Sequence, residues 1–218
     1  LTFDSHGVHQ SDRHQIRLIG GEWVATGDAD GWVRLRDIIL AEIHPHQVNF
    51  ARSSNAGCFG ISVENHDLYS EANRLSINGS APIGIDFKPA SLTGGVGSES
   101  FHDTFLDSCH LNVSKIGIRF RGNWQYGTCL NCAVFLTAAG GDGFVFDAPR
   151  MDGTVITSQK IESPPDPGEV TALVTKRGYD GFYGPLLLGG WYTGYGITSV
   201  SRDDSGAAPA LLQLKLTE

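Results

Sequence analysis

A short pattern with glycine in second place recurs along the chain and limits the possible fold more than any other feature. The clear copies are residues 59–63, 83–87, 116–120 and 142–146, and a weaker copy is 195–200. Their glycines lie 24, 33, 26 and 53 residues apart, and 53 is close to twice 26. A repeat of about 20–50 residues is typical of solenoids and propellers.

Each copy predicts a short strand, because apolar side chains alternate with other residues. Ile83, Ile85 and Phe87 would point to one face of such a strand. No helix of ordinary length fits between the copies, and their uneven spacing disfavours a propeller. The repeat therefore predicts an all-β fold, a right-handed parallel β-helix with irregular rungs.

We expect a single domain over residues 1–218, with a cap region at 1–45, rungs at 46–200 and a final strand at 201–218. Residues 37–43 could form a short helix or a strand that shields the open end of the coil. An apolar face on the final strand would invite a partner chain.

The composition agrees with a β-rich chain and excludes several function classes. Glycine accounts for 28 of 218 residues and charged residues for only 18%, as expected for short strands joined by tight turns. A net charge of −8 argues against nucleic-acid binding, which needs a basic surface. No apolar run is long enough to span a membrane. An anionic sugar remains possible where basic residues cluster locally.

The cysteines do not indicate a metal site. Cys58, Cys109, Cys129 and Cys132 are expected to be small buried core residues, with at most one disulfide among them. The pair Cys129 and Cys132 lacks a second pair or histidines at zinc spacing. No nucleotide-binding motif is present either, so no metal and no cofactor are predicted.

The segment 102–126 carries the densest group of side chains that can do chemistry. Strand alternation and a turn predicted at 122–127 together place a set of these side chains on one solvent-facing side. Alternation places His110, Asn112, Lys115, Arg119 and Arg121 there, and the turn adds Asn123, Trp124 and Tyr126.

Such a face would suit a polysaccharide that carries carboxylates. Arginine binds carboxylates through two hydrogen bonds, and tryptophan stacks on the apolar face of a sugar ring. We therefore expect Arg119, Arg121 and Lys115 to hold the polymer and Trp124 to stack on it.

The same face could break the polymer beside a uronic acid by β-elimination. A base removes the proton alpha to the carboxylate, and the carboxylate must be neutralised by directed hydrogen bonds. We expect Tyr126 to be base and acid, with Asn123 or Asn112 and His110 as neutralising groups.

Other interpretations remain open. Tyr126 could simply pack in a turn, and Arg119 and Arg121 could be solvated outward positions. Asp103 and Asp107 could instead form the carboxylate pair of a glycoside hydrolase of the tail-spike type. The chain could also be a non-enzymatic receptor-binding module of a phage tail.

Residues 6–32 together with GIRFRGNWQYGTCLNC at 117–132 resemble the small secreted hyaluronate lyases of Streptomyces. The general character of the sequence also resembles that of phage-tail hyaluronidases and depolymerases. The resemblance implies cleavage of hyaluronan by β-elimination without a metal, secretion, and a homotrimer. In the phage-type family an aspartate works with a tyrosine. Here Tyr126 would be the tyrosine, and either Asp103 or Asp107 the aspartate.

Overall fold

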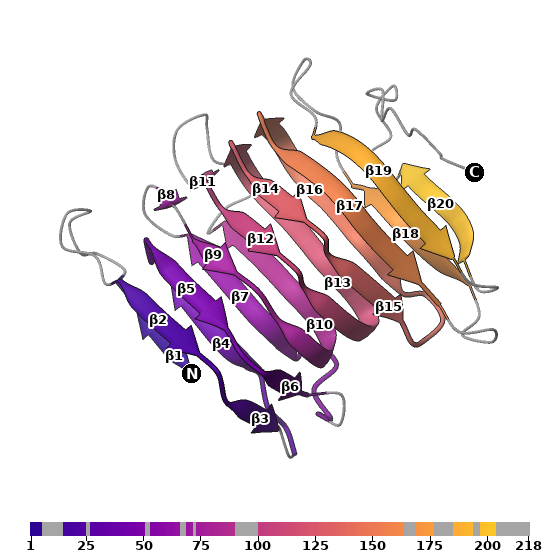
Figure 1. Ribbon diagram of the computed structural model, residues 1–218. Helices are drawn as coiled ribbons and strands as arrows, with labels where there is room; N and C mark the ends of the chain where they lie inside the picture. Colours follow the sequence, from indigo (N-terminus) through magenta and orange to yellow (C-terminus); the bar gives the residue numbers. More distant parts are fainter. Residues whose placement is uncertain are drawn as a thin grey trace.

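The chain folds into a β-solenoid. The computed structural model describes residues 1–5, 15–24, 27–50, 53–65, 69–71, 73–89, 100–163, 169–176, 185–193 and 197–203. These residues contain twenty strands and no helix, so no described helix could cross a membrane. The strands pair in parallel, and Figure 1 shows them side by side from β1 to β20. The predicted all-β parallel solenoid is confirmed.

The first ladder of strands runs the length of the solenoid. Its members are β1 (Thr2–Asp4), β4 (Gly31–Arg36), β7 (Phe59–Asn65), the second part of β10 (Asn78–Pro89), the middle of β13 (His110–Gln125), the first part of β16 (Asp142–Asp152), β18 (Val170–Thr175) and β20 (Ile197–Asp203).

Two further ladders form the other sides of the coil. The second consists of β2 (Ile16–Ile19), β5 (Ala41–His44), β9 (Arg74–Leu75), β12 (Phe105–Asp107), β14 (Thr128–Leu130) and the starts of β17 (Val155–Glu162) and β19 (Leu186–Thr193). The third consists of β3 (Glu22–Val24), β6 (Gln47–Asn49), the starts of β10 and β13, β15 (Ala133–Leu136) and the ends of β17 and β19.

A short ladder lies between the first and the second. It consists of β8 (Tyr69–Glu71), β11 (Ser100–His102) and the ends of β13 and β16. One strand can therefore belong to several sides. The start of β13 pairs in the third ladder, its middle in the first and its end in the short one.

The repeated pattern marks equivalent positions on successive turns. Phe59 pairs with Ile83, Ile83 with Ile116, and Ile116 with Asp142. The weaker copy at 195–200 does not follow this register, because Asp142 pairs with Thr171 and Thr171 with Ser199, and its Gly196 lies outside the described residues. The four clear copies thus predicted the register of the first ladder.

The glycine column explains why the second place of the pattern is so restricted. A Cβ on Gly84 would lie 2.5 Å from the carbonyl oxygen of Gly117, and one on Gly117 would lie 2.5 Å from that of Gly143. Side chains of the core close the remaining space, such as Leu111 beside Gly84. A larger residue could fit only if neighbouring turns moved apart.

The interior is filled by apolar side chains that stack from turn to turn. Phe87, Phe120 and Phe146 are almost parallel, with ring centroids 5.9 and 5.5 Å apart. Such stacked aromatic pairs add to the stabilisation that burial itself provides. This stack supports the side of the solenoid that carries the candidate site.

The expected division into cap and rungs differs from the structure. Strands β1 to β5 lie within residues 1–45, and they already pair in the same ladders as the later turns. Of the segment 37–43, the last three residues belong to the strand β5. At the other end, residues 204–218 of the predicted final strand lie outside the described residues.

Residues with positive φ turn the chain at two corners. Asp103, Tyr126 and Gly153 occupy one corner, with φ of 48°, 55° and 60°. Ser108, Asn131, Ser158 and Gly189 occupy the corner between the second and third ladders. The left-handed region is costly for most residues. Its recurrence at the same corners of successive turns is therefore a regular feature of this solenoid.

Candidate functional site: a corner of the solenoid

The side chains expected to form one site lie on separate sides of the molecule. His110 and Asn112 are exposed on the third ladder, whereas Arg119 lies on the first. Tyr126 is in the turn after the short ladder. The expectation of a single shared surface is wrong, because β13 bends around the coil instead of running along one face.

Arg119 and Arg121 bind an internal carboxylate. Arg119 donates from Nε and Nη2 to Asp86 at 2.9 and 2.6 Å, and Arg121 donates from Nη2 to both oxygens of Asp86 at 2.9 Å. Asp86 is only 1% exposed. Burial lowers the pKa of Arg119, but hydrogen bonds and the charge of Asp86 more than offset this, so the pKa is raised overall. Their assignment to substrate binding is corrected, because these guanidiniums are engaged in holding adjacent turns together.

Trp124 is part of the core and cannot stack on a sugar in this structure. It is 1% exposed, and its ring lies 4.6 Å from Phe87 and 5.0 Å from Phe120. Its indole nitrogen donates to the carbonyl oxygen of Arg121 at 3.0 Å. The turn expected at 122–127 does not begin at 122, because β13 continues to Gln125 and its inward column passes through Trp124, which pairs with Phe101 and Met151.

Tyr126 is the predicted catalytic residue whose placement suits a role at the surface. Its side chain is 66% exposed, and its amide donates to the carbonyl oxygen of Asp152 at 2.7 Å. The ring rests against Gly153, where a Cβ would lie 2.8 Å from Cδ1 of the ring. The glycine therefore provides the space that this orientation needs.

Asp103 occupies the same corner one turn earlier. Its amide donates to the carbonyl oxygen of Gln125 at 3.0 Å, so Asp103 and Tyr126 are neighbours on successive turns. Asp107 instead lies at the next corner, where it accepts a hydrogen bond from Ser108 Oγ at 2.9 Å. Of the two aspartates that the sequence left open, Asp103 is the one beside Tyr126.

Polar side chains of the short ladder border this corner. His102, Gln125 and Asp152 are in register on successive strands, and all three are half-buried. Asn123 is in the next outward column and is 9% exposed. We call His102, Asp103, Asn123, Gln125 and Tyr126 the corner site.

A cation close to the corner site is already paired. Arg150 forms an ion pair with Asp152, and these residues follow Asn123 and Gln125 in register. Lys115, which was expected to hold the substrate, is exposed at the bend between the third and first ladders. Hydrogen bonds from imidazole and amide groups are therefore what the corner site can offer to an anion.

The four cysteines are core residues. All four are buried and none forms a disulfide. Hydrogen bonding to Cys132, together with burial, raises the pKa of Cys109 and Cys129. Buried thiols of this kind are unreactive core residues. Among the described residues, no three His, Cys, Asp or Glu side chains are grouped to hold a metal ion.

Sequence reasoning missed two features. The first is Gln125, an outward residue of the corner site. Its signal in the sequence was strand alternation, because Gln125 directly follows Trp124, which is buried. The second feature is an open pocket of about 510 Å³ beside Trp191. The glycine pair Gly189 and Gly190, directly before an aromatic residue in a strand, could have indicated it.

No family model, curated protein or solved structure matched the chain in our comparisons. The resemblance to secreted hyaluronate lyases therefore stays a prediction.

Proposed function

We propose that the chain cleaves an acidic polysaccharide by β-elimination at the corner site. Hyaluronan is the leading candidate for this substrate. The observation that supports this most is the exposed Tyr126 beside Asp103, with His102 and Gln125 on the adjoining strands. A phenol that can reach a polymer at the surface is placed next to groups that can bind a carboxylate.

In the proposed reaction, Tyr126 acts as base and then as acid. The tyrosinate takes the proton from the sugar carbon alpha to the carboxylate, and the electron pair of that C–H bond forms a carbon–carbon double bond. The bond from the neighbouring carbon to the glycosidic oxygen breaks. The proton then passes from Tyr126 to this oxygen, so the phenol is deprotonated again before the next cycle. Acid–base catalysis by a positioned side chain contributes about 10²–10⁴-fold.

Neutralisation of the carboxylate is assigned to Gln125, His102 and Asn123. Negative charge builds up on the carboxylate as the proton leaves, and directed hydrogen bonds stabilise it most when they are already in place. Gln125 and His102 are in register on neighbouring strands, and Asn123 precedes Gln125 by two residues on the same side. This replaces the earlier assignment of His110 and Asn112, which lie on another side of the coil.

Asp103 is proposed to take the phenol proton of Tyr126, directly or through a water molecule, so that Tyr126 can act as the base. It is a carboxylate one turn away, at a strand spacing of about 4.8 Å. Asp103 is also exposed, as contact with a bound polymer would require.

The experiment is incubation of the full chain with hyaluronan, chondroitin, alginate and pectate while ultraviolet absorbance is followed. A lyase leaves an unsaturated uronide that absorbs, so we expect absorbance to rise with at least hyaluronan. New reducing ends without absorbance would indicate a glycoside hydrolase instead. Binding of a polymer without either product would indicate a receptor-binding module and contradict the proposal.

Secretion and the homotrimer stay predictions. The outer face of the second ladder becomes apolar in its later turns, with Phe105, Val155, Leu186 and Leu188 directed away from the core. Apolar sheet faces of this kind are often covered by another chain. Light scattering of the purified chain should give three times the mass of 23.4 kDa, and a monomer mass would contradict the trimer.

A further inference from the structure

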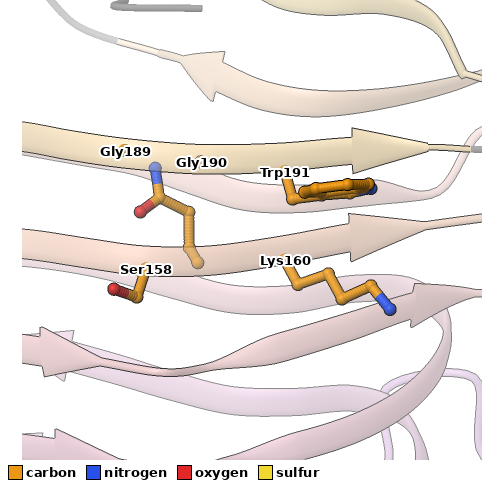
Figure 2. A pocket seen from close by; sticks show the side chains of 6 residues that line it. Ser158, Lys160, Gly189, Gly190 and Trp191 are labelled. Atoms are coloured by element: carbon orange, nitrogen blue, oxygen red, sulfur yellow. The ribbon is translucent and has the colours of Figure 1, made fainter. Parts of the chain in front are cut away.

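A second candidate site lies at the corner between the second and third ladders. It is an open pocket of about 510 Å³ formed by β17 and β19, which pair through Gln159–Gly190 and Lys160–Trp191. Its lining residues are Ser158, Gln159, Lys160, Gly189, Gly190 and Trp191, and Figure 2 shows the pocket from close by.

Trp191 gives the pocket an aromatic surface. Its ring is 64% exposed, whereas Trp32 and Trp124 are 2% and 1% exposed and Trp23 is half-buried. Leaving a ring of this size in water costs free energy that burial would recover. An exposed aromatic ring at the wall of a pocket is therefore suited to a ligand that has a flat apolar face.

Two glycines precede this ring, and they have different roles. Gly189 has a φ of 60°, and a Cβ there would meet nothing within 4 Å. At Gly190 a Cβ would collide with the hydroxyl of Tyr192 and approach Gln159 Nε2 to 2.8 Å, so this glycine makes room for the internal contact between Gln159 and Tyr192. Gly189 therefore leaves open space near Trp191 that a planar ring can enter.

The polar groups at the pocket offer a balanced set of donors and acceptors. Lys160 Nζ lies 2.8 Å from Glu162 Oε1, and both side chains are more than one third exposed. Gln159 is 2% exposed, and its Nε2 donates to Tyr192 Oη at 2.9 Å. Its Oε1 has no hydrogen-bond partner among the described residues. A buried acceptor of this kind gains from a ligand hydroxyl or a water molecule that reaches it.

We propose that this pocket binds a neutral pyranose unit of a glycan, with one face of the sugar stacked on Trp191. Adjacent hydroxyls of a sugar can accept from Lys160 and donate to Glu162, which a single anion cannot do. Since Glu162 already neutralises Lys160, the pocket has no excess positive charge to select a carboxylate. The same balance, in a chain of net charge −8, disfavours a nucleobase with its phosphates.

This site is independent of the proposed cleavage reaction. The corner site and the pocket lie on opposite sides of the second ladder, and Trp191 is on a later turn than Tyr126. A glycan that contains neutral and acidic sugars could contact both sites, but binding in the pocket does not require cleavage.

The test is a titration of the full chain with defined neutral tetrasaccharides of glucose and of N-acetylglucosamine. The heat of binding gives the affinity of each variant, and the NMR signal of the Trp191 indole N–H locates binding in the natural chain. We expect at least one of them to shift this signal. Trp191→Ala should weaken its binding about tenfold or more, as removal of an aromatic anchor does. The matched control is Val24→Ala, because Val24 is 69% exposed on the same ladder, far from the pocket.

Two results would overturn the proposal. One is that neither tetrasaccharide shifts the Trp191 signal, and the other is that Trp191→Ala binds as well as the natural chain. Tyr126→Phe should leave this binding unchanged, because Tyr126 belongs to the corner site. A chain that binds a tetrasaccharide in the pocket but releases no unsaturated product from hyaluronan would therefore contradict the lyase proposal alone.

Discussion

Asp103 and Tyr126 occupy the same corner of two successive turns, both with left-handed backbone conformations. The amide of Asp103 donates to the residue that precedes Tyr126, and the amide of Tyr126 donates to Asp152 on the following turn. The coil thus places two residues that are 23 positions apart at neighbouring points on an exposed edge. This placement, and not a continuous basic face, is what supports a reaction at the surface.

Asp103 and Asp107 were equal candidates for the catalytic aspartate in the sequence, but their substitution should affect turnover differently. We expect Asp103→Asn to lower the turnover of hyaluronan about 10²-fold, because it removes a carboxylate beside the proposed base. Asparagine tolerates the left-handed conformation, so the corner should keep its shape. Initial rates of the increase in ultraviolet absorbance give the measurement.

Asp107→Asn is the matched control for that variant. Asp107 lies at the other end of β12 and accepts from Ser108, so we expect nearly natural turnover. Equal loss of activity in both variants would argue against a specific role for Asp103.

The charged cluster around Asp86 should contribute to stability and not to binding. Asp86→Asn removes the carboxylate that holds Arg119 and Arg121, and we expect it to lower the free energy of unfolding by about 3–5 kcal/mol. Chemical denaturation measures this change. Asp4→Asn is the control, since Asp4 pairs with Arg36 at an exposed site, where such a pair contributes about 1 kcal/mol or less.

The earlier interpretation of the arginines as substrate-binding groups makes the opposite prediction. If it were right, Arg119→Gln would weaken binding of hyaluronan while the free energy of unfolding stayed unchanged. We expect loss of stability instead, with affinity for the polymer unaltered in the folded fraction.

Glu64 should make stability depend on pH in the acid range. Burial alone would raise the pKa of Glu64, but the charge of Arg34, 3.0 Å away, and hydrogen bonds from Arg36 and Ser62 lower it overall. A carboxyl whose pKa is lowered by folding stabilises the chain above its unfolded pKa, and this contribution is lost as pH falls through the folded value.

Unfolding of the natural chain and of Glu64→Gln should therefore be compared between neutral and acid pH. We expect the difference in free energy of unfolding between them to shrink as the solution is acidified below the ordinary pKa of a glutamate. A difference that stays constant, or that grows, would show that the carboxylate of Glu64 is not what the arginines stabilise.

The glycine column offers a test of the turn-to-turn register. In Gly117→Ala the new methyl group would meet the Gly143 carbonyl and both methyl groups of Val134 at 2.5–2.7 Å. We expect a loss of about 1–3 kcal/mol in the free energy of unfolding, as for other overpacked cores. Gly57→Ala should change it by less than about 0.5 kcal/mol, because its nearest contact is a side-chain oxygen at 3.3 Å. Similar stability of both variants would contradict the close approach of turns.

The fold could be predicted because the repeat carries its own register. Each glycine is required by the carbonyl of the next turn, so Gly60, Gly84, Gly117 and Gly143 leave a signal in the sequence at four successive turns. The candidate site could be predicted only in part. Alternation tells whether a side chain faces the core or the solvent, but not on which ladder of the solenoid it lies. His110 and Arg119 both face outward on β13, yet the strand bends between them into another ladder.

Trp124 shows a second limit of the sequence pattern. It lies in a turn-like stretch rich in polar residues, but the register of the short ladder directs it into the core against Phe87. For Arg119 the sequence did carry a sign of its partner, because the repeat aligns Asp86 with Arg119 on successive turns. It gave no such sign for Arg121, which lies two residues further along the strand and binds the same carboxylate.

The most direct test of cleavage at the corner site compares the natural chain with Tyr126→Phe on hyaluronan, with absorbance and binding measured on the same samples. We expect the natural chain to release unsaturated uronide, and the variant to bind the polymer equally well while producing none. Tyr192→Phe is the control, because Tyr192 is at the far side of the second ladder. Unsaturated product at the natural rate from Tyr126→Phe would contradict the proposed mechanism.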